Sequence, residues 1–259
     1  MSTASTTFQR PRWERVAAST TWGSYVSDVE KGAILQGHLL AGRPQKALEV
    51  GCEGGRWSEM LSELGWKMTC TDVDRDNLLL CQRRLPDARC ILADPADRSF
   101  ACESRSLSLL LCIEVPPVIN SDWFLSEANR VLTDGGVVVG IFWNLLSWRS
   151  VLVRAKSALF GGKEFYKQTW ADWKQELPAN GFELISEEGF CWAPFSRESN
   201  SRLVPAFTKA ERTLRLNRLT TFSPWIAFVV RKAVSPKTPA GRTALLSDTI
   251  EPVSAGQKL

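Results

Sequence analysis

A glycine-rich turn, Gly51–Gly55, is the segment of this sequence best suited to hold a ligand. It follows a buried-strand pattern at Ala47–Val50 and precedes a helical pattern at Trp57–Leu64. Glycine lets the backbone bend sharply and approach a ligand closely, and the following helix presents free N–H groups and a positive dipole end. The turn therefore predicts a ligand-binding loop between a strand and a helix.

An acidic residue stands about twenty positions further on, as in nucleotide-binding sites. Asp72 ends the next strand pattern, Lys67–Thr71, where its carboxylate can accept hydrogen bonds from both hydroxyls of a ribose. An NAD(P)-dependent oxidoreductase would have the same layout, but its Gly-x-Gly-x-x-Gly fingerprint does not match this turn. That class stays an alternative, which the glycine spacing disfavours.

Strand and helix patterns alternate around these residues from Ala47 to Phe142. Two further strands are predicted at Phe182–Phe190 and Trp225–Val230, and Thr169 can cap a helix that runs to Leu177. Strands that alternate with helices at this spacing imply right-handed crossovers and a parallel sheet. The predicted fold class is therefore α/β, Rossmann-like and doubly wound.

The chain resembles the class I S-adenosylmethionine (SAM)-dependent methyltransferases, especially the group with quinone and small-molecule methyltransferases, from about Lys46 to Phe142 and more weakly to Lys232. The segments that carry the resemblance are Leu48-Glu49-Val50-Gly51-Cys52-Glu53-Gly54-Gly55, Thr69-Cys70-Thr71-Asp72-Val73-Asp74, Ile91-Leu92-Ala93-Asp94 and Leu132-Thr133-Asp134-Gly135-Gly136-Val137. Two positions depart from the family pattern. Glu53 replaces the middle glycine of the first motif, and Asp134 replaces a proline.

This resemblance implies SAM as the cofactor and a mostly parallel seven-stranded sheet with an antiparallel late strand and a small cap insertion. It implies that Asp72 binds the ribose and that Asp94 meets the exocyclic amine of adenine. Pro95 has no N–H to offer the adenine ring. The residues expected to bind the cofactor are Glu49, Gly51, Cys52, Glu53, Gly55, Asp72, Val73, Asp94, Pro95 and Glu114.

Two residues are candidates for acid–base chemistry. Many relatives have a histidine just after the fourth strand, where this chain has Glu114. Glu114 would act on the acceptor or contact the methionine part of SAM. The alternative is that Glu114 is a solvated acid at the strand end. His38 is the only histidine, on an N-terminal helix that often closes over SAM in this family, and a structural role is the alternative. Trp22 and Tyr25 would line the same lid, and Asn144 would orient an acceptor.

The expected activity is methyl transfer from SAM to a small-molecule acceptor, which is quinone-like, lipid-linked, a saccharide or a natural product. The 11 tryptophans would suit an apolar or sugar-ring acceptor or simply pack the cap. A non-catalytic SAM-binding regulatory protein is the other alternative. The arginines are scattered in a chain of net charge +4, so no nucleic-acid partner is expected.

No metal site is predicted, because the seven cysteines form no Cys-x-x-Cys pair and one histidine cannot complete a Cys/His zinc set. Several cysteines lie in apolar runs, which indicates buried free thiols in a reducing compartment. Met1–Thr7 has no apolar core of a signal peptide, and no apolar run approaches the roughly 18 residues of a membrane span. A cytoplasmic protein is therefore expected, with its oligomeric state left open.

The predicted organisation has three parts. Residues 1–43 form an N-terminal helical lid segment, loose up to residue 20 and helical over Ser27–Leu40. Residues 44–232 form the methyltransferase domain, and residues 233–259, rich in Pro, Ser, Thr and Gly, are expected to be a disordered tail. Cap insertions are expected near 144–168 and 191–222. Residues 145–160 read as a basic amphipathic helix that either covers the site or rests on a membrane surface.

Overall fold

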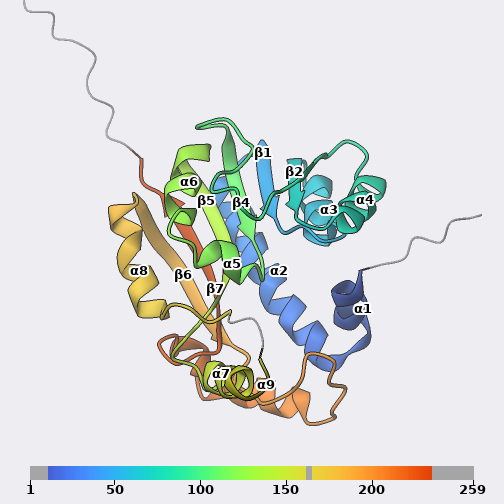
Figure 1. Ribbon diagram of the computed structural model, residues 1–259, viewed down its shortest axis with the longest axis vertical. Helices are drawn as coiled ribbons and strands as arrows, with labels where there is room; N and C mark the ends of the chain where they lie inside the picture. The colour runs from blue at the N-terminus through green and yellow to red at the C-terminus, as the bar shows by residue number, and fades with distance from the viewer. Residues whose placement is uncertain (1–10, 162–164, 235–259) are drawn as a thin grey trace, which may run out of the picture.

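Seven strands form one twisted sheet at the centre of the computed structural model, which describes residues 11–161 and 165–234 (Figure 1). The strands are β1 Lys46–Val50, β2 Lys67–Asp72, β3 Arg89–Leu92, β4 Leu107–Cys112, β5 Leu132–Trp143, β6 Phe182–Phe190 and β7 Trp225–Lys232. Their order is β3-β2-β1-β4-β5-β7-β6, and only β7 runs antiparallel to its neighbours. The predicted seven-stranded Rossmann-like sheet with an antiparallel late strand is confirmed.

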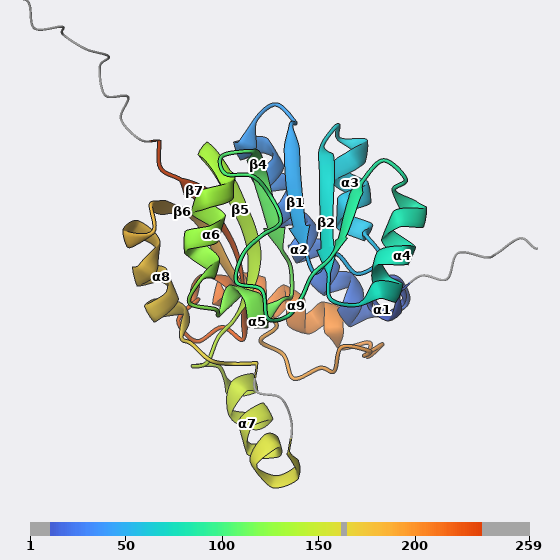
Figure 2. The ribbon, with the colours of Figure 1, turned by 45° about the horizontal axis from the view of Figure 1, so that its top comes forward.

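Helices cover both faces of this sheet (Figure 2). One face carries α2 Thr21–Ala41, α3 Arg56–Glu63 and α4 Arg75–Arg84, and the other carries α5 Pro116–Ile119, α6 Phe124–Val131 and α8 Trp170–Ala179. Successive strand residues point to opposite faces, so Leu109 and Leu111 join the first core while Leu110 and Cys112 join the second. β4 is buried along its whole length, as a central parallel strand must be.

The N-terminal segment is organised differently from the predicted lid. The stretch expected to be loose contains a helix, α1 Arg12–Ser19, and α2 begins at Thr21 because the Thr20 side chain accepts a hydrogen bond from the Gly23 N–H. α2 packs against β4, β5 and β7 and buries Ile34 completely. It is therefore a layer of the fold rather than part of a lid, because its apolar side faces the sheet.

Two helices outside these layers occupy the predicted cap insertions. α7 Trp148–Phe160 lies in the first and projects away from the sheet (Figure 2). α9 Val204–Thr213 and the short 3-10 helix η1 Leu216–Arg218 lie in the second. The predicted Thr169 cap of α8 is confirmed, since its side chain accepts the Asp172 N–H.

Three remaining expectations concern helix starts, the tail and the membrane. α6 begins at Phe124 without a side-chain cap, later than the predicted cap at Asn120 or Ser121, because Ser121 instead donates to the Val118 carbonyl in the turn after α5. Of the predicted tail, residues 235–259 lie outside the described residues. Within 11–161 and 165–234, none of the helices has the length and apolar character needed to cross a membrane.

Candidate functional site

The glycine-rich loop lies where the strand order reverses. β1 pairs with β2 on one side and β4 on the other, so the connections that leave these strands diverge and open a crevice at their carboxyl ends. Gly51 (φ +69°) and Gly55 (φ +76°) adopt the left-handed conformation, and the Gly51 N–H donates to the Thr71 carbonyl over 2.8 Å. A Cβ on Gly51 would lie 2.5 Å from a Val115 methyl group, so the loop needs glycine there for space as well.

Glu53 takes the conformation of the glycine that it replaces. Its φ is +50°, in the left-handed region that non-glycine residues rarely adopt. Its N–H donates to Asp72 Oδ2 over 2.8 Å, which ties the loop to the end of β2. Burial raises the pKa of the Glu53 carboxyl. The substitution therefore preserves the path of the loop and adds a half-buried acid to the crevice.

Asp72 lies beside this loop with its carboxylate held in place. One oxygen accepts the Glu53 N–H and the other accepts the Asp74 N–H over 2.9 Å. Asp72 is not the cap of α4, because Asp74 accepts the N–H groups of that helix's first turn. The Asp72 side chain is buried at the carboxyl edge of the sheet, with further lone pairs left to accept hydrogen bonds.

An exposed apolar shelf continues from Asp72 along the same edge. Val73 is 61% exposed and Leu92 is 53% exposed, and β2 and β3 pair at Asp72 and Leu92. Asp94 follows β3, is exposed, and accepts the Ala96 N–H over 2.8 Å. Pro95 is exposed and supplies no N–H. The structure thus brings Asp72, Val73, Asp94 and Pro95 to one edge.

Glu49 supports the loop from behind. It is 2% exposed at the end of β1, and the Ser58 hydroxyl of α3 donates to its carboxyl. Burial raises its pKa to about 8. Its side chain therefore braces β1 against α3 and does not face the crevice.

A small cavity of about 30 Å³ opens at the end of β4. Glu114 lines it, with φ +55°, and its carboxylate pairs with the Arg197 guanidinium. Arg197 also stacks over two indole rings, at 4.4 Å from the Trp13 centroid and 4.7 Å from the Trp225 centroid. The other lining residues are Val16, Ala17, Trp22, Gly23, Val26, Ser27, Glu30 and Arg56.

Glu30 of α2 is the most unusual residue of this cavity. It is completely buried, and one carboxyl oxygen accepts a hydrogen bond from Arg56 over 2.7 Å. The other oxygen, Oε1, has no hydrogen-bond partner among the described residues. Burial, followed by the nearby Glu114 carboxylate, raises the pKa of Glu30. A buried carboxyl with an unpaired oxygen is costly, and the neighbouring Glu114 carboxyl can share a proton with Glu30.

Three residues of this cavity were not predicted from the sequence: Glu30, Arg56 and Arg197. Glu30 had a detectable signal, since it interrupts the buried face of α2 between Val26 and Ile34 at helical spacing. Arg197 had none, because it comes from an irregular segment 83 residues away from Glu114.

α1 covers the crevice. Pro11 lies so close to the glycine-rich loop that a Cβ on Gly54 would be 2.3 Å from its ring. Both carboxyl oxygens of Glu14 accept hydrogen bonds from the Arg84 guanidinium of α4, over 2.9 and 2.8 Å. Trp13, Val16 and Ala17 of α1 form part of the wall of the cavity, whose volume of about 30 Å³ corresponds to about two water molecules.

His38 does not join these residues. It lies in the last turn of α2, where its Nδ1 accepts a hydrogen bond from Trp66 Nε1 over 3.0 Å. Trp66 directly precedes β2, so this pair lies at the amino edge of the sheet, opposite the glycine-rich loop. A larger cavity of about 510 Å³ lies at that edge, lined by Trp66, Lys46 and Arg89 among others. The expectation that His38 lies over the cofactor is corrected, because α2 carries it to the opposite end of the sheet.

Trp22 lines the cavity as expected, but Tyr25 and Asn144 do not. Tyr25 donates to Glu211 over 2.6 Å, and burial raises the pKa of its hydroxyl. The Asn144 amide is fully buried and holds the backbone of residues 220–223, and its oxygen accepts the Leu146 and Trp170 N–H groups. Asn144 therefore fixes loops, and nothing of it is left to orient an acceptor.

The tryptophans divide between core and cavity. Trp170 and Trp173 are stacked at 5.2 Å in the core beneath α8. Trp143 instead stacks on Trp225 at 5.1 Å, near Arg197. Trp170 and Trp173 thus simply pack the core, while Trp143 and Trp225 form part of the wall around Arg197.

Comparisons with known proteins agree with this architecture. Residues 47–136, from β1 to the turn in β5, match the family described as "Methyltransferase domain". A SAM-dependent methyltransferase from Mesorhizobium loti superposes with a TM-score of 0.58 at 15% identity, over 79% of this chain and 98% of that one. One from Archaeoglobus fulgidus gives 0.53 at 15% identity, over 80% and 94%.

A third solved structure has a defined acceptor. Geranyl diphosphate C-methyltransferase from Streptomyces coelicolor, in complex with Mg²⁺, geranyl-S-thiolodiphosphate and S-adenosyl-L-homocysteine, gives a TM-score of 0.53 at 16% identity, over 77% of this chain and 76% of that one. No curated protein matches the sequence. Residues 47–136 therefore match a methyltransferase-domain family, and the chain has the fold of SAM-dependent methyltransferases.

Proposed function

We propose that this protein binds SAM across the carboxyl ends of β1, β2 and β4 and transfers the SAM methyl group to a small-molecule acceptor. The observation that carries the proposal is the fixed Asp72 carboxylate beside the glycine-rich loop, held by the Glu53 and Asp74 N–H groups. Such a carboxylate suits the two hydroxyls of a ribose, and the Val73 and Leu92 shelf suits a flat, partly apolar base.

The charges of the small cavity suit the other half of the cofactor. SAM supplies an electrophilic methyl group on a sulfonium cation, next to an amino-acid terminus. Arg56 and Arg197 are cations that can pair with its carboxylate, and Glu30 and Glu114 can pair with its ammonium group or face the sulfonium charge. The fit requires the cavity to widen, which the shift of α1 would provide.

Acid–base chemistry on the acceptor falls to Glu30 or Glu114. One buried oxygen of Glu30 has no hydrogen-bond partner among the described residues, and burial raises the Glu30 pKa, so this carboxyl can exchange a proton with an acceptor hydroxyl or amine. Glu114 faces it across the cavity and influences its charge. Holding acceptor and cofactor in line supplies much of the remaining rate enhancement.

The acceptor wall is aromatic. Trp13 and Trp22 line the cavity, and Trp143 and Trp225 stack beside Arg197. This lining favours an apolar or ring-containing small molecule, and quinone-like, lipid-linked, saccharide and other natural-product acceptors are all compatible with it. The free cysteines support the cytoplasm as the compartment, since thiols stay reduced there.

Calorimetric titration tests the cofactor directly. We expect SAM and S-adenosylhomocysteine to bind with micromolar affinity and NADH not to bind, because the loop lacks the dinucleotide glycine spacing. Binding of NADH without SAM would contradict the proposal and restore the oxidoreductase alternative. Binding of SAM without turnover of any acceptor class would favour the regulatory alternative.

Replacement of Glu30 tests the acceptor chemistry. In Glu30→Gln we expect kcat to fall roughly 10²- to 10⁴-fold, the usual contribution of a positioned acid or base, with a changed pH–rate profile. Glu211→Gln is a matched control, because Glu211 is also a buried carboxyl but is bonded to Tyr25 outside the cavity. An unchanged kcat in Glu30→Gln would remove this residue from the chemistry.

A further inference from the structure

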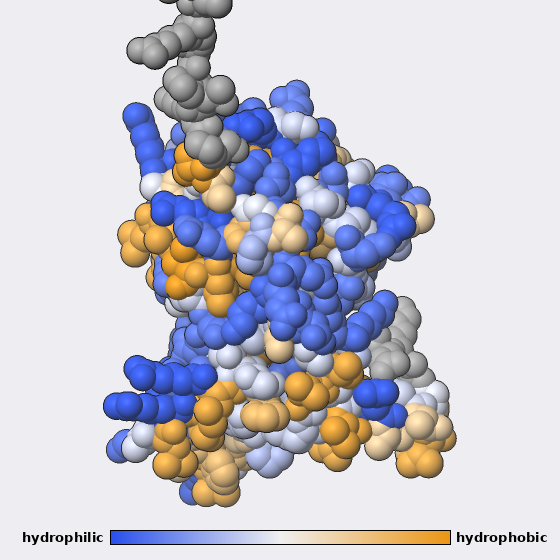
Figure 3. Space-filling model, turned by 90° about the vertical axis from the view of Figure 1, so that its left-hand side faces the viewer, coloured by the Kyte–Doolittle hydropathy of each residue, from blue (hydrophilic) through white to orange (hydrophobic). Residues whose placement is uncertain are grey.

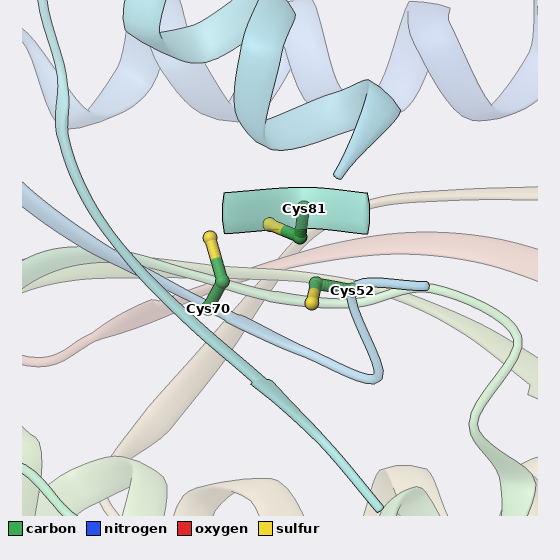
Figure 4. Close-up of side chains that lie close together, drawn as sticks. All are labelled: Cys52, Cys70 and Cys81. Carbon is green, nitrogen blue, oxygen red and sulfur yellow. The ribbon is translucent and has the colours of Figure 1, made fainter. Parts of the chain in front are cut away.

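Four cysteines from four segments converge behind the glycine-rich loop. Cys52 belongs to the loop, Cys70 to β2, Cys81 to α4 and Cys90 to β3. The sulfur atoms of the first three lie within 4.8 Å of one another, and all three side chains are buried (Figure 4). The fourth sulfur, of Cys90, lies 3.7 Å from that of Cys81. None of the four is in a disulfide.

The spacing of these sulfurs is close to that of a thiolate metal site. Zn–S bonds of about 2.3 Å in a tetrahedron place ligand sulfurs about 3.8 Å apart. Cys81 and Cys90 already have this separation. The sulfurs of Cys52, Cys70 and Cys81 lie within 4.8 Å of one another, so metal binding would draw these three side chains and that of Cys90 closer together.

The surroundings also resemble the outer shell of such a site. Cys70 Sγ lies 3.1 Å from the Ser58 hydroxyl, which in turn donates to the Glu49 carboxyl. Hydrogen-bonded partners of this kind orient the ligands of metal centres. Cys52 is 2% exposed, and its sulfur lies within 4.8 Å of the sulfurs of Cys70 and Cys81.

We propose that Cys52, Cys70, Cys81 and Cys90 form a binding site for a thiophilic metal cation, and that Zn²⁺ is its occupant. Thiolates are soft ligands that select such cations, and the tetrahedral four-sulfur arrangement is typical of zinc. On binding, each S–H bond breaks, its proton passes to solvent and the sulfur lone pair forms the bond to the metal. No electron is transferred, so the step needs no oxidant.

Such an ion would join three elements of the fold to the loop. Cys52 would be tied to β2, β3 and α4, so zinc would fix the loop before any cofactor binds. This inference does not depend on the proposed function, because none of its four ligands needs SAM. Zinc loading should therefore raise the melting temperature of the protein, as any ligand specific to the folded state does.

Cobalt substitution tests the site in the full-length, reduced and metal-free protein. One equivalent of Co²⁺ should produce sulfur-to-cobalt charge-transfer absorption and the visible bands of tetrahedral coordination, and one equivalent of Zn²⁺ should abolish both. Native mass spectrometry should then show one zinc per chain. Absence of the charge-transfer band, or octahedral bands alone, would overturn the proposal.

Variants locate the ion. Cys70→Ser and Cys81→Ala should each weaken Co²⁺ and Zn²⁺ binding roughly 100-fold, since each removes one thiolate from the ligand set. Cys102→Ser is the matched control, because Cys102 is a free cysteine outside the cluster, and it should bind metal like the parent. Parent-like metal binding in both cluster variants would overturn the assignment. SAM is also titrated into the zinc-free protein, so that SAM binding and metal binding are measured independently and either proposal can fail without the other.

Discussion

Two acidic residues at the site adopt backbone conformations that acids rarely take. Glu53 and Glu114 both have φ near +50°, one in the loop after β1 and one at the end of β4. Left-handed conformations of non-glycine residues cost about 1–3 kcal/mol and cluster where function maintains them. These conformations place one carboxyl in the glycine-rich loop and one in the wall of the small cavity.

Asp72 allows a direct test of the proposed ribose contact. In Asp72→Ala we expect SAM to bind roughly 10- to 150-fold more weakly, since one charge-assisted hydrogen bond contributes about 1.5–3 kcal/mol. Asp74→Ala is the control in calorimetry, because Asp74 caps α4 and should cost about 1 kcal/mol of stability while leaving SAM affinity unchanged. Equal SAM affinity in Asp72→Ala and the parent would exclude the contact.

At the scale of elements, α1 covers the crevice and forms part of the wall of the small cavity. Its contacts are the Pro11 ring on Gly54, the Glu14–Arg84 ion pair and the Trp13 ring on Arg197. These contacts come from side chains on α1 itself, while α2 stays packed on the sheet. A shift of α1 therefore opens the crevice without disturbing the core.

Weakening the attachment of α1 should speed cofactor exchange. In Glu14→Gln we expect SAM association and dissociation to become roughly 3- to 10-fold faster, because a partly buried ion pair contributes about 1 kcal/mol to the closed state. Stopped-flow measurements of tryptophan fluorescence follow this exchange. Arg98→Gln, which breaks an exposed ion pair with Asp122 far from α1, should leave the rates unchanged. Unaltered rates in Glu14→Gln would show that α1 is not the barrier.

α7 gives a second prediction at this scale. Hydrophobic surface gathers at the lower end of the molecule in Figure 3, the end at which Figure 1 labels α7 and α9. The exposed apolar residues of α7 include Val151, Leu152, Leu159 and Phe160, which are 60–79% exposed. Arg154 and Lys156 lie on the same helix. A helix with apolar and basic residues binds anionic lipid surfaces through both.

We therefore expect the protein to co-sediment with anionic vesicles and much less with neutral ones. Phe160→Glu should reduce the bound fraction several-fold, because it removes apolar area and adds a repelled charge. Leu79→Glu is a matched control on α4, where Leu79 is also exposed. No binding to anionic vesicles would contradict a membrane-binding role for α7.

At the scale of the whole molecule, buried carboxyl groups make stability depend on pH. Burial raises the pKa of Glu49 to about 8 and that of Glu211 to about 7, and it also raises the pKa of Glu30. An unfolded glutamate has a pKa of about 4.3. As the pH rises, the unfolded chain therefore loses these protons before the folded protein does. The contribution of the protonated carboxyls to the free energy of unfolding is complete below about pH 4 and is lost towards pH 8.

We expect the free energy of unfolding to fall by about 1–4 kcal/mol between pH 5.5 and 8.5, measured by urea denaturation. Glu49→Gln keeps the shape of the side chain and cannot ionise, so its stability should depend less on pH. The pKa of Glu127 shifts in the opposite direction, because its hydrogen bond with Arg130 lowers it. Glu127 therefore changes the free energy of unfolding only as the pH falls below about 4. If the free energy of unfolding depended on pH in the same way in the parent and in Glu49→Gln, the raised pKa of Glu49 would be contradicted.

Local patterns in the sequence were sufficient to predict the sheet and the acids at the ends of its strands. The apolar run of β4, the turn at Gly51–Gly55 and the acid at Asp72 are each set by neighbouring residues. Parallel β–α–β connections then bring the ends of consecutive strands to one edge, so a residue's place at a strand end predicts its neighbours there. Helix starts were less predictable, because the cap at Thr20 competes with other polar residues nearby.

The sequence by itself determined the fold class, the glycine-rich loop and the acids that follow β1, β2 and β3, because short-range periodicity and turn chemistry fix them. Only the tertiary structure decided that His38 lies at the opposite edge, that Glu30 is buried with an unpaired oxygen, and that Arg197 meets Glu114. It also decided the convergence of the cysteines. Those outcomes depend on how α2 and two insertions pack on the sheet, and no local pattern encodes contacts between segments so far apart.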